Sequence, residues 1–256
     1  MTFDLSPWHF LLVMGRTASL IAFFPMLSEL RIPKAVRAGI ALWTSLVITP
    51  LVPVSAFQPA TIPDLTIALV LETFIGTLFA FVIRLIIAGI VTGVQWIDSE
   101  IGFQAAMQMN PLSGTPSSPF GTMALSIIAL IFWSSGFFEN LLVLWTRIFQ
   151  ILPPPITSIS LETGTVLLTL SCHIFAGAIE IAAPIVALMF LLSLAMGLLA
   201  RAVQGINIFF ETFTLKILLG IPSIIILTPY LVNVMQQHLN LVPTHWQQLL
   251  HAIKAS

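Results

Sequence analysis

The stretch that decides the fold is residues 65–96, which reads LTIALVLETFIGTLFAFVIRLIIAGIVTGVQW and contains only two charged residues, Glu72 and Arg84. A helix needs about 20 apolar residues to cross the roughly 30 Å hydrocarbon core of a bilayer. Backbone polar groups in lipid must be satisfied within the segment, which a continuous helix achieves, whereas a β-barrel would show alternating segments of about ten residues. The stretch therefore predicts membrane helix, either one long tilted helix or two shorter ones.

The same pattern recurs along the chain, which has 256 residues and is 58% hydrophobic and 7% charged. Soluble domains carry about 25% charged residues, so this chain cannot cover a water-facing surface. Residues 122–152 and 166–199 are also too long for one ordinary span, and Gly136 and Pro184 are the candidate breaks. Further apolar runs cover residues 10–27, 39–54 and 209–234. We predict an all-α, polytopic membrane protein of six to eight hydrophobic helices, several long or broken, in one integral-membrane domain over residues 1–256.

Residues 243–256 have a different character and form an amphipathic tail. Thr244 and Gln247 match a capping pattern, and the apolar residues Trp246, Leu249, Leu250 and Ile253 share one helical face. The tail is predicted to be a short helix that lies either on the lipid surface or against a partner.

Charges inside the apolar runs need partners, because each costs about 2.5–3.5 kcal/mol at membrane depth. Glu72 and Arg84 are separated by roughly 18 Å of helix, so they cannot pair with each other. Two interpretations remain open, buried ion pairs at helix or subunit contacts and a proton or ion path. The candidate buried or assembly residues that follow from this pattern are Arg16, Glu72, Arg84, Glu180 and Lys216.

The composition also bears on binding chemistry. The formal net charge of −1 excludes a nucleic-acid surface, which needs clustered cations. No metal-binding, nucleophile or redox motif is present, so we expect no cofactor, no metal and no catalytic residue.

Residues 97–121 interrupt the apolar pattern and read IDSEIGFQAAMQMNPLSGTPSSPFG. The segment is rich in turn signals, such as Asn110-Pro111 and Ser113-Gly114. An irregular segment of this length in a membrane protein is an exposed loop, is buried in protein, or lines a water-filled space. Met107 and Met109 are residues that usually fill core gaps, and they could also seal a passage around a variable polypeptide.

This segment resembles that of the FliR/SctT family of type III secretion export apparatuses. Its order of Asn110-Pro111, Ser113-Gly114 and then Ser117-Ser118-Pro119 looks most like the injectisome branch, whereas the N-terminal signature from Arg16 to Pro50 fits the flagellar branch equally well. Leu152-Pro153 matches a helix end. Near the C-terminus Arg201, Gln204, Asn207 and Lys216 match the family's arginine–glutamine–asparagine pattern, although Val203 stands where the family usually has proline.

The resemblance implies a non-enzymatic core subunit of a protein export gate in the bacterial inner membrane. Such a subunit closes a pore complex of FliP/SctR-like and FliQ/SctS-like partners, arranged as helical hairpins, and meets a FlhB/SctU-like switch protein, exported unfolded proteins and lipid. It adds Arg201, Gln204 and Asn207 to the assembly residues. The loop would plug the pore, with these candidate plug residues: Phe103, Gln104, Met107, Met109, Asn110, Pro111, Leu112, Ser113, Gly114, Pro119 and Phe120.

Two other classes of protein fit the composition. A small-molecule secondary transporter is the main alternative, and it would show paired inverted repeats with matching broken helices. We find no such pairing, although Pro184 could mark one break. An intramembrane enzyme would need a catalytic pair, and none is visible.

Overall fold

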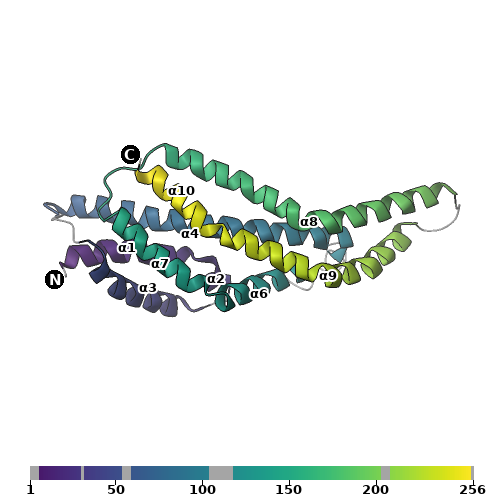
Figure 1. Cartoon of the computed structure of the whole chain (residues 1–256), viewed down its shortest axis with the longest axis horizontal. Helices are drawn as coiled ribbons and strands as arrows, with labels where there is room; N and C mark the ends of the chain where they lie inside the picture. Colours follow the sequence, from purple (N-terminus) through teal and green to yellow (C-terminus); the bar gives the residue numbers. More distant parts are fainter. Residues whose placement is uncertain (1–5, 30–31, 54–58, 104–117, 203–207, 255–256) are drawn as a thin grey trace. The chain divides into compact units, whose positions relative to one another are not determined.

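The computed structural model describes residues 6–29, 32–53, 59–103, 118–202 and 208–254, and these contain helices and turns but no β-strand. The all-α class is therefore confirmed for the described part of the chain (Figure 1). The elements, in chain order, are α1 (Pro7–Phe23), α2 (Pro25–Glu29), α3 (Lys34–Ile48), the 3₁₀ turn η1 (Thr49–Leu51), α4 (Ile62–Ile101), α6 (Pro119–Ser134), α7 (Phe137–Ile151), α8 (Glu162–Ala202), α9 (Ile208–Asn240) and α10 (Val242–Lys254).

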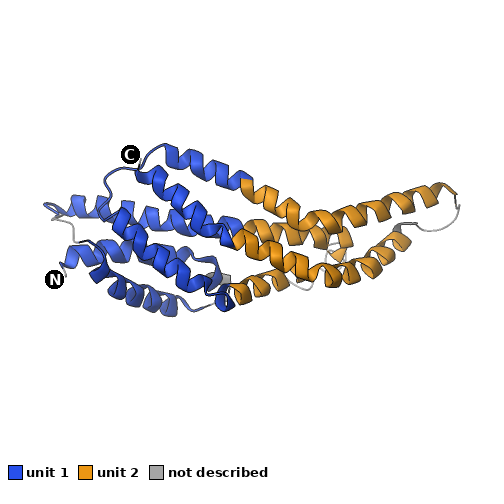
Figure 2. Cartoon of the chain, viewed as in Figure 1, with its two compact units in different colours: residues 1–87, 132–172, 240–256 blue, residues 88–131, 173–239 orange. Residues whose placement is uncertain are grey.

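The chain divides into two compact units, coloured separately in Figure 2. Unit 1 comprises residues 1–87, 132–172 and 240–256. Unit 2 comprises residues 88–131 and 173–239. Because α4 and α8 continue from one unit into the other, each long helix contributes to both cores.

The core of unit 1 is built around three aromatic residues, Phe79, Trp145 and Trp246, all at most 1% exposed. Their ring centroids are 5.4–5.8 Å apart, the distance at which edge-to-face contacts are favourable. The indole Nε1 of Trp246 donates to the Phe79 carbonyl at 3.0 Å, and that of Trp145 donates to Thr17 Oγ1 at 3.3 Å. Both buried indole N–H groups therefore have partners.

Trp246 belongs to α10, which is the predicted amphipathic tail. The apolar face of α10 is buried in unit 1 at Val242, Trp246, Leu249, Leu250, Ala252 and Ile253. The tail is helical as predicted, but the chain itself covers its apolar face, which neither the lipid-surface nor the partner-docking alternative anticipated.

The long apolar runs take different forms. Residues 65–96 lie within one helix, α4, of 40 residues. Residues 122–152 divide between α6 and α7, which are bent by 68° at the break. Gly136 is the N-cap of α7 with φ +67°, a left-handed conformation that glycine adopts without steric cost. The predicted break at Gly136 is therefore confirmed.

The break proposed at Pro184 is wrong, because α8 runs through this proline as a single helix of 41 residues. A proline at this position leaves the carbonyl of residue 180, four residues earlier, without its helical donor. Tyr230 of α9, the one tyrosine of the chain, donates its hydroxyl to the Glu180 carbonyl at 3.2 Å. The orphaned acceptor is thus satisfied from the neighbouring helix, and α8 continues.

In unit 2, α4 and α8 approach closely at two glycines spaced as in a GxxxG motif. A Cβ at Gly89 would lie 2.5 Å from Ile174 Cγ2, and one at Gly93 would lie 2.6 Å from the Ala178 carbonyl oxygen. Small residues let helix backbones approach when the surroundings are as apolar as the helices themselves. The motif fixes the α4–α8 contact.

Three stretches of helix are long and apolar enough to cross a membrane: Ile62–Ile101, Glu162–Ala202 and Phe210–Lys254. The number rises to four if the bent α6–α7 pair counts as one span. The prediction of six to eight hydrophobic helices is not confirmed at this level. The chain is nonetheless a membrane protein by the length and composition of these helices.

Replacing Gly93 by alanine tests the α4–α8 contact. The new methyl group meets a backbone oxygen, so we expect a lower unfolding temperature in detergent, although alanine is about 1 kcal/mol more favourable in a helix interior than glycine. Gly197, on the same pair of helices, has open space where a Cβ would stand, with no other atom within 4 Å, so Gly197→Ala should be neutral or stabilising. Equal effects of the two substitutions on the unfolding temperature would contradict the close approach.

Candidate functional site

A buried ion pair joins three segments of unit 1. Arg16 on α1 and Glu72 on α4 are both 0% exposed, and Arg16 Nε donates to Glu72 Oε2 at 2.5 Å. The other carboxylate oxygen, Oε1, accepts from the Ile156 backbone N–H at 3.0 Å. The Arg16 Nη1 group donates to the Leu152 carbonyl at 2.7 Å. The pair thereby holds the chain that follows α7 against α1 and α4.

This network assigns partners to two of the predicted buried charges. Breaking a buried ion pair is costly, because the remaining charge keeps its desolvation penalty without compensation. The guanidinium also lies over the Phe149 ring, 4.7 Å from its centroid, a favourable cation–π geometry. The contacts are those of a structural tie within unit 1.

The root of the central loop lies in unit 2, where α4 ends and α6 begins. Ser118 precedes Pro119 and occupies the N-cap of α6, where its Oγ accepts from the Gly121 N–H at 2.8 Å. The Ser118 hydroxyl donates to the carboxyl group of Asp98, which is fully buried in the last turns of α4. Serine before proline is a strong helix-start signal, and here the same hydroxyl joins both ends of the loop.

Aromatic side chains reinforce this root. Phe103 and Phe120 meet edge to face, with ring centroids 5.3 Å apart. Gly102 has φ +100°, and a Cβ there would lie 2.8 Å from the ring of Phe213 on α9. A left-handed glycine is a usual way to end a helix, and this one also makes room for the α9 ring.

Helix α9 is tied to the same end of α4 by charge and by close packing. Lys216 Nζ lies 3.4 Å from Glu100 Oε2, and both side chains are partly exposed. A Cβ at Gly220 would lie 2.7 Å from Ile101 Cγ1. The loop root, which we define as Asp98, Phe103, Ser118, Phe120 and the Glu100–Lys216 pair, is thus fixed by α4, α6 and α9.

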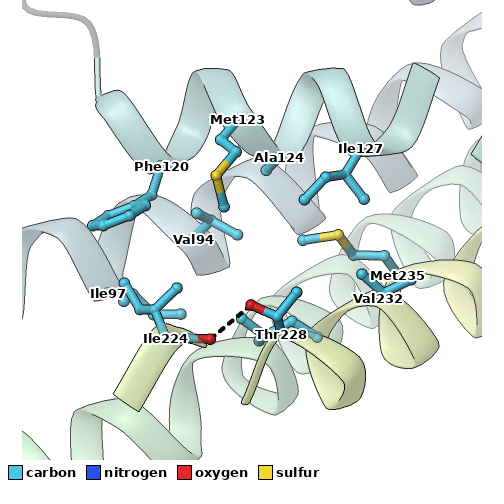
Figure 3. A pocket seen from close by; sticks show the side chains of 11 residues that line it. Val94, Ile97, Phe120, Met123, Ala124, Ile127, Ile224, Thr228, Val232 and Met235 are labelled. Carbon is cyan, nitrogen blue, oxygen red and sulfur yellow. Dashed lines mark hydrogen bonds between the residues drawn. The ribbon is translucent and has the colours of Figure 1, made fainter. Parts of the chain in front are cut away.

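Beside the loop root these three helices line a small, partly open apolar cavity of about 20 Å³. Figure 3 shows Val94 and Ile97 of α4, Phe120 and Met123 of α6, and Met235 of α9 pointing toward it. A cavity of this size holds about one water molecule, and an apolar lining offers that water no partners. The cavity is a packing gap and not a ready-made ligand site.

The remaining predicted site residues fall into three groups. Pro119 is exposed and, with Phe103 and Phe120, is a predicted plug residue within the described structure. Arg84, Glu180 and Arg201 are exposed on this chain, and Glu180 Oε2 lies 3.2 Å from His238 Nε2 of α9. The predicted residues that lie outside the described part of the chain are Gln104, Met107, Met109, Asn110, Pro111, Leu112, Ser113, Gly114, Gln204 and Asn207.

Sequence reasoning missed several residues that hold unit 2 together. Ser118 had a readable signal in its position before Pro119, and Gly89 and Gly93 had one in their spacing. The role of Asp98 had none, because it depends on the return of α6 to the end of α4.

Glu72→Gln tests the structural tie in unit 1. The amide leaves Arg16 as an uncompensated buried cation, so we expect a loss of about 3–5 kcal/mol of stability, seen as a lower unfolding temperature of the detergent-solubilised chain. Glu139→Gln on α7 is the matched control, because Glu139 is exposed and its loss should cost no more than about 0.5 kcal/mol. Equal unfolding temperatures of Glu72→Gln and Glu139→Gln would show that the ion pair contributes nothing to stability.

Ser118→Ala tests the loop root. The substitution removes the α6 cap, worth about 1 kcal/mol, and leaves the buried Asp98 carboxyl without its donor. We expect faster amide hydrogen exchange over residues 120–122, while Ser126→Ala on the same helix, whose hydroxyl bonds to the Thr122 carbonyl, should leave that exchange unchanged. Unaltered exchange in Ser118→Ala would contradict a root fixed by this hydroxyl.

Comparison with known proteins agrees with the resemblance found in the sequence. The model of the family described as bacterial export proteins, family 1, matches residues 8–242. The chain is similar to the flagellar biosynthetic protein FliR of Escherichia coli K12, at 26% identity over 84% of this chain and 82% of the relative. It is similar to FliR of Bacillus subtilis 168, at 24% identity over 87% of this chain and 86% of the relative.

A relative from another kind of system also matches. The secretion system apparatus protein SsaT of Salmonella typhimurium LT2 is 28% identical over 56% of this chain and 64% of its own length. None of these relatives supports the small-molecule transporter alternative. Because the family model covers most of the chain, the chain belongs to bacterial export proteins family 1, the FliR/SctT family.

Proposed function

We propose that this chain is a non-enzymatic core subunit of a type III protein export gate, and that it works inside a multi-subunit assembly in the bacterial inner membrane. Family membership supports the export role, since the relatives are named as flagellar biosynthetic and secretion-apparatus proteins. The physical argument for an assembly comes from the lengths and the exposed faces of the helices.

The observation that carries the proposal is the mismatch between α8 and a bilayer. Its 41 residues extend about 60 Å, whereas a 30 Å core takes up about 40 Å of helix even at a steep tilt of 40°. Apolar side chains are nevertheless exposed toward both ends of the helix, as at Leu168 (69%) and Leu198 (67%). Part of this apolar surface must lie outside the hydrocarbon, where another protein has to cover it.

Helix α9, like α8, leaves most of its apolar surface uncovered. In the most apolar 18-residue segment of α8, and in that of the α9–α10 stretch, only 22% of residues are buried, against 61% in α4. The chain therefore covers α4 more than it covers α8 and α9, which present bare apolar faces. Neighbouring subunits of the FliP/SctR-like and FliQ/SctS-like classes, with a FlhB/SctU-like switch protein, would supply the missing helices.

The central loop would plug the pore that this assembly surrounds. The loop root supports this role, because three helices and a buried carboxyl group fix the two ends of the loop next to each other in unit 2. Plug residues between 104 and 117 lie outside the described structure, and their role stays a prediction. The cargo would be unfolded exported polypeptide, which a flexible thioether lining at Met107 and Met109 suits.

Deleting residues 112–117 tests the plug while leaving Ser118 and the root in place. In proteoliposomes that contain the chain with its copurified subunits, we expect the deletion to raise ion permeability well above that of the wild-type complex, because the pore loses its obstruction. The control replaces the same six positions by glycine and serine, which keeps the loop length.

If the complex with the deletion is no more permeable to ions than the wild-type complex, the plug hypothesis is refuted. A permeability increase that appears only in the deletion, and not in the replacement, would assign the seal to the bulk of the loop. An increase in both would assign it to the side chains. Failure of the wild-type chain to copurify with any other subunit would refute the assembly itself.

A further inference from the structure

Arg84 is an exposed cation on α4, which its own chain covers more than it covers α8 or α9. It makes no hydrogen bond or ion pair with the described residues, whereas Arg16 and Lys216, two other predicted cations, each have an acidic partner. Nearby on the same exposed side of α4 lie Phe74, at 49% exposure, and Phe81, at 41%. The guanidinium therefore emerges from an apolar face without a counter-charge.

Arg84 also lies far from both ends of α4. At 1.5 Å per residue it is about 33 Å from Ile62 and about 26 Å from Ile101. It is the only lysine or arginine on this helix, and residues 85–97 that follow it carry no charge. Arg84 therefore lies well inside an apolar helix, where a bare guanidinium calls for an anionic partner.

The exposed positions around Arg84 share one face of α4. Val70, Phe74, Thr77, Phe81 and Arg84, which we call the Arg84 face, follow one another in steps of four and three residues and are exposed or partly exposed. A face with this spacing is one along which another helix can pack at a crossing angle near 20°.

We propose that the Arg84 face is the docking surface for a helix of a different subunit, and that this helix carries an aspartate or glutamate at the depth of Arg84. A carboxylate is the charge that a guanidinium binds in a planar, two-point arrangement. The two phenylalanines and Val70 supply the apolar contact around the pair. The inference rests on the proposed function, because only a multi-subunit assembly offers such a helix.

The first arm of the test identifies the neighbour. Phe81 is replaced by the photo-reactive analogue p-benzoylphenylalanine in the full chain, in cells that express the whole gene cluster, and the cross-linked peptide is sequenced. The expected product is a helix of another subunit with an acidic residue within one turn of the cross-link. A lipid adduct, a second copy of this chain, or a helix without an acidic residue would overturn the proposal.

The second arm measures the charge. Arg84→Gln should reduce the recovery of that subunit with the purified chain by about 30-fold or more, the effect of removing one member of a buried charge pair. Arg84→Lys should recover part of the complex. Arg147→Gln on α7 is the matched control, because Arg147 is also exposed, and it should leave recovery unchanged.

The third arm shows whether the two charges act together. The acidic residue found by cross-linking is replaced by its amide, alone and with Arg84→Gln, and the double variant should lose no more complex than either single one. Additive losses would overturn the pairing. If the wild-type chain retrieves a partner and Arg84→Gln retrieves equal amounts, only this inference falls; if wild type retrieves none, the proposed function falls with it.

Discussion

The fold depends on how closely other helices can approach α4. At Gly76 there is no room for a Cβ next to the carbonyl of Arg16 on α1, within unit 1. At Gly89 and Gly93 the same is true against α8, within unit 2, and the Ile101 side chain fills the space above Gly220 of α9. Between helices in apolar surroundings, exclusion of water offers little driving force, and close van der Waals contact has to replace it.

This closeness explains why a charged pair can exist in the core of unit 1. Gly76 lies one turn after Glu72 on α4. Because glycine has no side chain, the backbone oxygen of Arg16 can occupy the space next to it. The glycine therefore brings the α1 backbone to the depth at which the Arg16 side chain reaches Glu72 and the chain after α7. A larger residue at position 76 would separate the charges as well as the helices, so packing and electrostatics in unit 1 are one constraint.

Much of the helical organisation could be predicted from the sequence, because it depends on local properties. The lengths of the apolar runs predicted α4 and α8, and the conformational freedom of Gly136 predicted the bend between α6 and α7. The failures share a different cause. The Glu180 carbonyl, which Pro184 leaves without a helical donor, accepts from the hydroxyl of Tyr230, 46 positions after the proline in the sequence.

The candidate site was less predictable for the same reason. The loop predicted over residues 97–121 was too long at both ends, because residues 97–101 belong to α4 and residues 119–121 to α6. The serine before Pro119 is a local signal for the start of α6, but the buried carboxyl of Asp98 acquires its role only when α6 returns to it. The covered face of α10 is a similar case: an amphipathic pattern shows that a face must be covered, and it contains no information about which surface covers it. Trp246 meets Phe79, which is 167 positions away in the sequence.

The charges that are paired within the chain, and those that are not, connect the fold with the proposed assembly. Arg16 and Glu72 are buried and compensate each other within the chain, and Glu180, though exposed, meets His238. Arg84 has no such counterpart among the described residues. A chain that pairs Arg16 with Glu72 internally, yet leaves Arg84 without a counter-charge on an apolar helix face, has a surface suited to an external acidic group. The apolar faces of α8 and α9 show only that something covers them, whereas this cation specifies the chemistry of the partner.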